Sequence, residues 1–189
     1  MHAVRELAKT ELPSQVKLTY LAEVLLTRDA GETPTMAFTP PAMADMPISA
    51  AAIYDVYFHG PAYQVLERVQ VQDDTATGLL AEELPPHTNP AGVVDLIAPR
   101  LVELCFQTAG VWDIHTNGRM GLPSSIGQVT AYRRMADAAG KRLYAVVKAH
   151  NNGSWFEATV VDEAGNVYVE LHGYFTVELP GRVSLKEGN

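Results

Sequence analysis

Apolar and polar residues alternate in several stretches of this chain, as they do in strands that bury one face. The second half shows this pattern four times, in SIGQVTAYRR, KRLYAVVKAH, SWFEATVVD and NVYVELHGYFTVEL. The turn-forming clusters DAAG, NNG and DEAG separate these stretches. We therefore predict four consecutive strands that form an antiparallel meander, over residues 125–134, 141–150, 154–162 and 166–179.

The middle of the chain predicts a short helix followed by two more strands. Ser49 is a good N-cap for the run AAAIYDVYF, which ends at Gly60 and Pro61. YQVLERVQVQ then alternates apolar and polar residues, and a turn at Asp73 and Asp74 leads into TATGLLAEEL. These two segments are predicted to pair as antiparallel strands.

The N-terminal part predicts a hairpin and a loop. Residues 15–27 contain the run VKLTYLAEVLL, rich in β-branched and aliphatic residues, and a turn at residues 29–32 separates it from TPTMAF. Residues 39–47 contain three prolines. Because proline lacks the amide donor that a sheet interior requires, this stretch is predicted to cross the surface as a loop.

The longest predicted helix is a mainly apolar run over residues 93–112, which follows the loop PPHTNPAG. A long apolar helix with strands on both sides fits an antiparallel sheet wrapped around one central helix. We therefore predict an α+β hot-dog fold and a single domain over residues 1–189. Residues 1–47 would form the N-terminal hairpin and Pro-rich loop, and residues 48–180 the hot-dog core.

The composition favours one packed domain and disfavours nucleic acid as a partner. With 189 residues, 47% hydrophobic and 19% charged, the chain can bury a core without disulfides or metals. A net charge of −8 opposes binding to a phosphate backbone. An acidic carrier protein would also be repelled, so its docking would need a local basic patch such as Arg133, Arg134, Lys141 and Arg142.

Cysteine, histidine and glycine usage argues against several other classes of protein. Cys105 is the single cysteine, so we expect a buried, inert thiol and no internal disulfide. The N-terminus lacks a signal-peptide pattern, and no apolar stretch reaches the roughly 20 residues that cross a bilayer, which predicts a cytoplasmic protein without a membrane span. No Cys or His cluster has metal-ligand spacing, and no Gly-rich phosphate loop follows a strand. Neither a metal nor a nucleotide cofactor is therefore indicated.

Glu103 is the most unusual residue of the predicted central helix, because it lies in the apolar run LIAPRLVELCFQTAG. An unpaired charge there would be costly unless it is neutralised or hydrogen-bonded. Gln107 follows at i+4 on the same face, where its amide can orient the Glu103 carboxyl. The pair is a candidate acid site. Alternatively, one edge of the helix is exposed to solvent, and Glu103 forms an ion pair there with Arg100 at i−3.

Three segments, IYDVYFHGPAYQVL, PRLVELCFQTAG and GLPSSIGQVTAYRR, follow one another in this order. Together they resemble the C-terminal hot-dog half of polyketide synthase and polyunsaturated fatty acid synthase dehydratases. The first is similar to the family's Tyr-Gly-Pro-x-Phe-Gln element, with His59 in place of the tyrosine and Tyr63 in place of the phenylalanine. The second is similar to Pro-x-x-x-Asp-x-x-x-Gln on the central helix, where Pro99 and Gln107 match and Glu103 replaces the aspartate. The third is similar to the Leu-Pro and strand that follow this helix.

The resemblance implies a dehydratase-like domain for 3-hydroxyacyl thioesters in polyketide or fatty acid biosynthesis. Its substrate would be carried by an acyl carrier protein or by CoA. Catalytic roles are implied for Glu103, Gln107 and His59. The residues expected to bind substrate lie in the same elements and in the loop before the central helix: Gly60, Pro61, Tyr63, Pro99 and His87.

Dehydration needs a base for the C2 proton and an acid for the departing hydroxyl. Glu103 is the candidate acid, and the base would be His59, His87 or a histidine of another polypeptide. The bend at His59 should face Glu103 across one cleft. In the alternative interpretation of each residue, His59 is a structural turn residue and His87 is an exposed loop histidine without a catalytic role.

The source of the base also bears on the partner. In the family the catalytic histidine lies on the N-terminal hot-dog half. Only about 45 residues precede the first matching segment here, too few for a second hot dog. We therefore expect either a homodimer or a hot-dog partner that carries the histidine.

Two other functions fit the same residues. A non-catalytic hot-dog module could bind an acyl chain, or complete a double hot dog with a histidine-bearing partner. A hot-dog thioesterase would use a carboxylate on or near the central helix to activate water, although the spacing from Pro99 to Gln107 argues against it.

Overall fold

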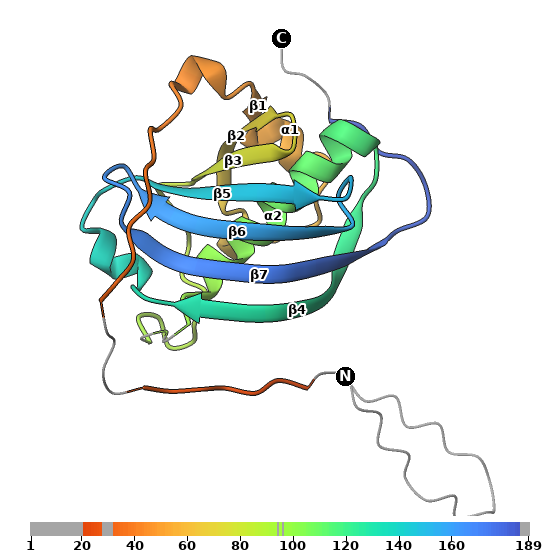
Figure 1. The fold of residues 1–189 in the computed structure, drawn as a ribbon. Helices are drawn as coiled ribbons and strands as arrows, with labels where there is room; N and C mark the ends of the chain where they lie inside the picture. The colour runs from red at the N-terminus through yellow and green to blue at the C-terminus, as the bar shows by residue number, and fades with distance from the viewer. Residues whose placement is uncertain (1–20, 28–31, 94, 96, 186–189) are drawn as a thin grey trace, which may run out of the picture. The chain divides into compact units, whose positions relative to one another are not determined.

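The chain divides into two compact units, residues 1–30 and 31–189. The computed structural model describes the following residues: 21–27, 32–93, 95 and 97–185. In the first unit, residues 21–27 have no regular secondary structure. Every helix and strand of the described residues belongs to the second unit (Figure 1).

The described residues of the second unit form one antiparallel sheet in the order β1-β2-β3-β5-β6-β7-β4. Its strands are Ile48–Ser49 (β1), Leu66–Gln72 (β2), Thr75–Leu80 (β3), Gly121–Ala131 (β4), Leu143–His150 (β5), Trp155–Asp162 (β6) and Val167–Glu178 (β7). The helices are Ala50–Tyr54 (α1) and Pro99–Asn117 (α2), with short 3-10 helices at Met43–Asp45 (η1), Pro61–Tyr63 (η2) and Met135–Ala138 (η3). Of the predicted four-strand meander, the antiparallel pairing of β5, β6 and β7 is confirmed. Its first strand, β4, is placed wrongly by the prediction, because β4 pairs with β7 at the edge of the sheet and not with β5.

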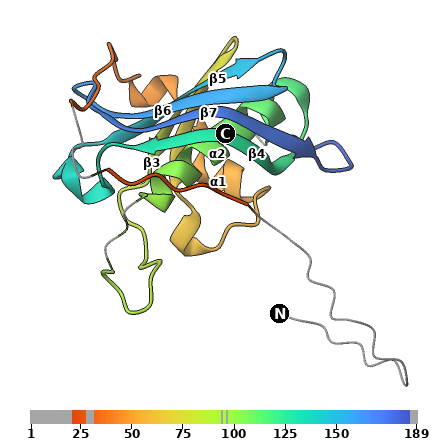
Figure 2. The same cartoon turned by 60° about the horizontal axis from the view of Figure 1, so that its bottom comes forward.

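Helix α2 lies against one face of the curved sheet, and the core lies between them (Figures 1 and 2). Along β5, Ala145 and Val147 point into this core, whereas Lys148 is exposed. Leu101 and Leu104 of α2 are fully buried in the same cluster. Alternation along the strands therefore places their apolar residues against the helix, and the hot-dog architecture is confirmed.

Helix α2 packs closely against β3 at Gly78. A Cβ atom built at this position would lie 2.1 Å from Thr108 Oγ1 and 2.8 Å from Leu66 Cδ2. Thr108 Oγ1 also donates to the Leu104 carbonyl at 2.7 Å, which keeps its side chain against its own helix. The missing side chain at Gly78 thus makes room for α2.

The predicted bounds of the central helix are wrong at both ends. It begins at Pro99 rather than residue 93, because proline suits the first helical turn and Ala98 has a left-handed φ of 47°. It continues to Asn117 and ends where Gly118, at φ 67°, donates to the Ile114 carbonyl at 2.9 Å. The extra C-terminal turn is buried at Ile114.

The predicted N-terminal hairpin does not form among the described residues. Residues 15–20 and 28–31 lie outside them, and residues 21–27 contain no strand. Beyond the predicted turn, Thr35 forms only an isolated bridge with Asn166. Leu21 and Leu25 are 88% and 86% exposed. Residues 15–20 and most of the predicted turn lie outside the described residues, so the pairing of the hairpin itself stays a prediction.

Smaller corrections concern strand ends. Strand β4 begins at Gly121 rather than residue 125 and includes Pro123, which is tolerated because β4 is the edge strand. Strand β3 ends at Leu80, before the predicted end at residue 84. The predicted N-cap is confirmed, since Ser49 Oγ accepts from the Ala52 amide at 3.4 Å, but α1 ends already at Tyr54.

Candidate functional site

Helix α2 presents Glu103 and Gln107 on the same face, as their spacing predicts. Gln107 Nε2 donates to Glu103 Oε1 at 2.8 Å. Gln107 is 2% exposed, whereas the Glu103 side chain is 21% exposed. The amide therefore anchors the buried side of the carboxyl group, whose other side reaches toward solvent.

His59 meets this pair from the bend before η2. Gln64 Nε2 donates to the His59 carbonyl at 3.0 Å and holds the bend closed. His59 Nε2 lies 3.0 Å from Glu103 Oε1, and its ring stacks on Phe58 with centroids 5.2 Å apart. The expectation that His59 faces Glu103 is confirmed.

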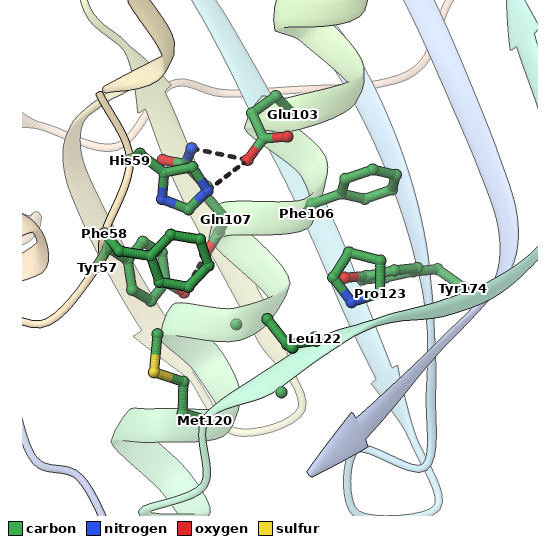
Figure 3. Close-up of a pocket in the computed structure, with 12 residues that line it drawn as sticks. Tyr57, Phe58, His59, Glu103, Phe106, Gln107, Met120, Leu122, Pro123 and Tyr174 are labelled. Atoms are coloured by element: carbon green, nitrogen blue, oxygen red, sulfur yellow. Dashed lines mark hydrogen bonds and ion pairs between the residues drawn. The ribbon is translucent and has the colours of Figure 1, made fainter. Parts of the chain in front are cut away.

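A pocket of about 190 Å³ opens beside the three polar side chains (Figure 3). His59, Glu103 and Gln107 occupy one end, and Leu122 and Met120 lie toward the other. The pocket is lined by Tyr57, Phe58, His59, Glu103, Phe106, Gln107, Gly110, Met120, Gly121, Leu122, Pro123 and Tyr174. An acid–base pair beside a mainly apolar wall can bind a small apolar group and move a proton on it.

The pocket lining contains the three residues predicted to be catalytic but none of those predicted to bind substrate. The residues predicted to bind substrate are absent from this lining: Gly60, Pro61, Tyr63, Pro99 and His87. Tyr63 contributes through its backbone, because its carbonyl accepts from Gln107 Nε2 at 2.8 Å. Substrate binding by these five residues stays a prediction.

His87 belongs to a second polar pair. Its Nε2 lies 2.5 Å from Asp95 Oδ2, and its ring meets the Tyr63 ring edge-on with centroids 6.0 Å apart. The His87 side chain is 16% exposed, so it is not the freely exposed loop histidine of the alternative interpretation. It nevertheless lies outside the pocket lining.

The alternative in which Glu103 pairs with Arg100 is wrong. Arg100 Nε donates to the Ala62 carbonyl at 3.1 Å, and its Nη2 donates to the Pro85 carbonyl. Arg100 thus holds two loops at the start of α2, while Glu103 bonds to His59 and Gln107. Burial lowers the pKa of Arg100. The nearby Tyr63 and Asp95 act in the opposite direction and raise this pKa, but by less.

Several residues of the site were missed by sequence reasoning. Tyr54 donates to Gln107 Oε1 at 2.8 Å, and Tyr57 donates to the Gln107 carbonyl at 3.1 Å. Tyr174 comes from β7, far along the chain, and Phe106 stacks on it with centroids 4.6 Å apart. The i, i+3 spacing of Tyr54 and Tyr57 places both on one face of the predicted short helix. This spacing was the sequence feature that could have indicated their role in the site.

The matching family model is described as the polyketide synthase dehydratase N-terminal domain, and it covers residues 34–185. This chain belongs to the polyketide synthase dehydratase family. Because the model's description names the N-terminal domain, it does not confirm the prediction that the chain corresponds to the C-terminal hot-dog half. None of the curated proteins matches the chain by sequence.

Solved dehydratase domains share the fold of this family member. The dehydratase domain of the CurF module of curacin polyketide synthase is 20% identical, with a TM-score of 0.56 over 77% of this chain and 55% of that one. A trans-AT polyketide synthase dehydratase domain from Brevibacillus brevis is 18% identical, with a TM-score of 0.59 over 80% and 56%. The chain thus spans about 55% of the length of these structures.

Two further neighbours are CurK dehydratase variants described as inactive. In one an aspartate is replaced by asparagine, with 19% identity and a TM-score of 0.56 over 73% of this chain and 51% of that one. In the other a histidine is replaced by phenylalanine, with 20% identity and a TM-score of 0.51 over 64% and 42%.

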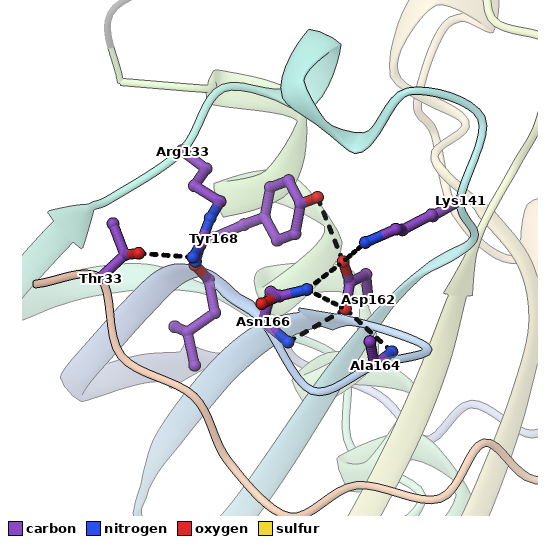
Figure 4. Close-up of polar contacts among 8 residues, drawn as sticks. Thr33, Arg133, Lys141, Asp162, Ala164, Asn166 and Tyr168 are labelled. Carbon is purple, nitrogen blue, oxygen red and sulfur yellow. Dashed lines mark hydrogen bonds and ion pairs between the residues drawn. The ribbon is translucent and has the colours of Figure 1, made fainter.

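The suggested basic patch on this dehydratase-family domain is largely neutralised by its own contacts. Arg134 pairs with Asp137 at 2.8 Å, and Lys141 pairs with Asp162 at 2.9 Å. Arg142 pairs with Glu67 and Glu82. Arg133 donates to Thr33 and to the Val167 carbonyl (Figure 4). These four side chains are thus engaged in contacts within the domain, three of them with carboxylates.

Other features of the domain agree with ordinary structural roles. Cys105 is buried, and burial raises the pKa of its thiol to about 12. A backbone hydrogen bond lowers this pKa, but its effect is smaller than that of burial. Within the described residues, no group of three or more His, Cys, Asp or Glu side chains could hold a metal ion. The helices of this described part are too short or too polar to cross a membrane.

Proposed function

We propose that this chain is a 3-hydroxyacyl-thioester dehydratase domain of polyketide or fatty acid biosynthesis. The observation that supports the proposal best is the carboxyl group of Glu103, held by two N–H donors at one end of an apolar pocket in a dehydratase-family fold. The described inactive CurK variants show that an aspartate and a histidine matter in that relative. In the pocket of the present chain, the carboxyl group is that of Glu103.

In the proposed reaction a histidine base removes the proton from C2 of the acyl group. The electron pair of the broken C–H bond forms the C2–C3 double bond, and the C3–O bond breaks. Glu103 donates its proton to the departing hydroxyl, which leaves as water. The products are a 2-enoyl thioester, a protonated base and a Glu103 carboxylate, and proton exchange with solvent restores both groups.

The thioester would be carried by an acyl carrier protein or by CoA. The apolar pocket walls, including Phe106, Leu122 and Tyr174, suit the acyl chain. Since the four suggested basic residues are engaged in contacts of their own, the pocket rather than a cationic patch is the feature expected to recognise the substrate. A cytoplasmic location remains part of this proposal.

We further propose that the domain works as a homodimer or beside a second hot dog. Strand β4 is a sheet edge of eleven residues, and Ile126 and Val129 on it are each 38% exposed. Open edges with apolar side chains favour pairing with another strand. The pocket lies between α2 and the start of β4, so a partner on this edge would lie near the acid site.

A second candidate is a non-catalytic acyl-binding module or partner half of a double hot-dog dehydratase. It is favoured by the coverage of about 55% of the CurF domain, which leaves almost half of that structure without a counterpart here. The pocket would then bind an acyl chain without turnover.

One assay separates these functions. The purified protein is mixed with a 3-hydroxyacyl and a 2-enoyl thioester, and both enoyl absorbance and free thiol are followed. Reversible hydration is expected for a dehydratase, thiol release indicates a thioesterase, and neither indicates a binding module.

Glu103→Gln should lower turnover by at least about 100-fold and leave the fold intact, because the amide keeps the shape of the carboxyl but has no proton to transfer. Glu163→Gln is the matched control, since Glu163 is exposed and lies outside the pocket. Full residual turnover of Glu103→Gln would rule out Glu103 as the acid.

A further inference from the structure

We propose that Tyr54 is a positioning residue that fixes the Glu103 carboxyl so that Oε1 stays occupied by N–H donors and Oε2 alone exchanges the reacting proton. The inference rests on the proposed dehydratase function and adds the atom of Glu103 that reacts. It also removes His59 from the candidates for the base.

The first step concerns the two oxygens of Glu103. Oε1 lies 3.0 Å from His59 Nε2 and 2.8 Å from Gln107 Nε2. Among the described residues no hydrogen bond to Oε2 is found, and Figure 3 shows both dashed contacts ending on the same oxygen. An oxygen that accepts two N–H groups has no lone pair directed at a further proton, so the acid form carries its proton on Oε2.

The second step concerns the orientation of the Gln107 amide. Its Nε2 donates to Glu103 Oε1 and to the Tyr63 carbonyl, each at 2.8 Å. Its Oε1 accepts from Tyr54. A flipped amide would place its oxygen against two acceptors and its nitrogen against a donor, so the network allows one orientation.

Tyr54 helps to determine this orientation because its hydroxyl oxygen already accepts a hydrogen bond. The Leu66 amide of β2 donates to Tyr54 Oη at 2.8 Å, which leaves the single hydroxyl proton for Gln107. A relay of hydrogen bonds therefore runs from β2 through Tyr54 and Gln107 to Glu103. Burial raises the pKa of Tyr54 above its ordinary value, although the Leu66 amide opposes this, so the phenol remains a donor.

His59 is held as a donor by its second nitrogen. Its Nδ1 is buried and has no hydrogen-bond partner, so a proton there would be buried without an acceptor. Placing the single proton of the neutral ring on Nε2 avoids this cost, and Nε2 then donates to Glu103 Oε1. His59 thus positions the acid, and of the three candidate bases His87 and a histidine of another polypeptide remain.

The other titratable groups around Glu103 do not offer a base. Tyr54 comes from α1, Tyr57 follows this helix, and Tyr174 comes from β7. Burial raises the pKa of Tyr57 and Tyr174, and the nearby Glu103 charge adds to the increase. All three phenols therefore stay protonated at neutral pH.

The test uses Tyr54→Phe, with Tyr132→Phe as the matched control. Tyr132 also donates its hydroxyl to a polar side chain, Glu170, but it lies outside the pocket. In Tyr54→Phe the side-chain NH2 protons of Gln107, observed by NMR, should shift and exchange faster with solvent. They should be unchanged in Tyr132→Phe. Unchanged Gln107 signals in a folded Tyr54→Phe protein would overturn the relay.

A double-mutant cycle, in which kcat and KM are measured for each variant, tests whether the hydrogen-bond relay contributes to turnover. Tyr54→Phe should lower kcat by about 10- to 100-fold with little change in KM, because misplacement of the acid affects the transition state. Tyr54→Phe combined with Gln107→Ala should lose no more than Gln107→Ala alone. Fully additive losses would contradict the proposal. If the wild-type protein turns over no thioester, the proposed function fails, while the NMR result still decides the relay.

The tautomer of His59 is a measurement that needs no variant. Long-range proton–nitrogen correlation, recorded where the ring is neutral, should show the proton on Nε2. A proton on Nδ1 would overturn the donor role of His59 and restore it as a candidate base.

Discussion

At the scale of single residues, Glu103 shows how a mainly apolar helix tolerates a carboxyl group. Burying a charge is costly unless hydrogen bonds replace water, and His59 and Gln107 supply two N–H donors to one oxygen. The i+4 spacing of Glu103 and Gln107 was visible in the sequence. The donor from His59 depended on the bend held by Gln64, which only the structure shows.

Asp162 is a second buried carboxyl group, and it has a structural role. It is fully buried and accepts from the side-chain amide of Asn166, from Lys141 Nζ and from the backbone amides of Asn166 and Ala164 (Figure 4). Burial alone would raise the pKa of Asp162, but these hydrogen bonds outweigh it and lower the pKa from 3.8 to about 2. Its contribution to stability is therefore full above about pH 4 and is lost as the pH falls toward 2.

We predict that Asp162→Asn lowers the free energy of unfolding by roughly 2 kcal/mol at neutral pH. The amide keeps the shape but places an NH2 group among donors. Urea denaturation at several pH values should show this difference shrinking between about pH 4 and pH 2, as the wild-type carboxylate becomes protonated. Asp137→Asn is the control and should have little effect, because the Arg134–Asp137 pair is exposed. A loss that is independent of pH would contradict the prediction.

At the scale of elements, α2 can pack closely against the sheet because the residue of β3 at the point of contact is a glycine. Gly78 of β3 lies against Thr108, whose hydroxyl is tied to the Leu104 carbonyl of α2. A larger residue at this point requires the helix or the sheet to move.

Gly78→Ala should therefore destabilise the domain by about 1–3 kcal/mol, the usual range for overpacking in a core. Thermal or urea unfolding followed by circular dichroism measures the change. Gly60→Ala is the matched control, because a Cβ atom at Gly60 has no neighbour within 4 Å. Equal stability of the two variants would show that α2 can shift without cost.

At the scale of the whole molecule, the open edge at β4 determines which assemblies are accessible. Along β4, residues from Ser124 to Val129 are all exposed, and they include the apolar Ile126 and Val129. Covering them would remove apolar surface from water and satisfy the free backbone groups of the edge.

Val129→Lys should weaken self-association or binding of a hot-dog partner without unfolding the domain, since a charge on an edge strand opposes pairing. Light scattering across a range of concentrations would show the wild type as a dimer and the variant shifted to monomer. Val93→Lys is the control, because Val93 is exposed in the loop before α2. A wild type that stays monomeric, with no partner in the source cells, would contradict the assembly.

The sequence by itself determined the features that depend on neighbours along the chain. The alternation of apolar residues predicted β5, β6 and β7, since a strand with one buried face repeats every two residues. Likewise, the helical repeat placed Gln107 next to Glu103. Residues 21–27 of the predicted N-terminal hairpin form no strand, because strand propensity by itself does not create the packed face that a strand needs.

Only the tertiary structure decided how distant segments meet. Tyr54 lies 53 positions before Gln107, and Tyr174 reaches the pocket from β7. The placement of β4 beside β7, rather than next in order after β3, brings Pro123 to the same pocket. Such contacts follow from burying all the apolar faces at once, and local propensity carries no information about which segments will share a face.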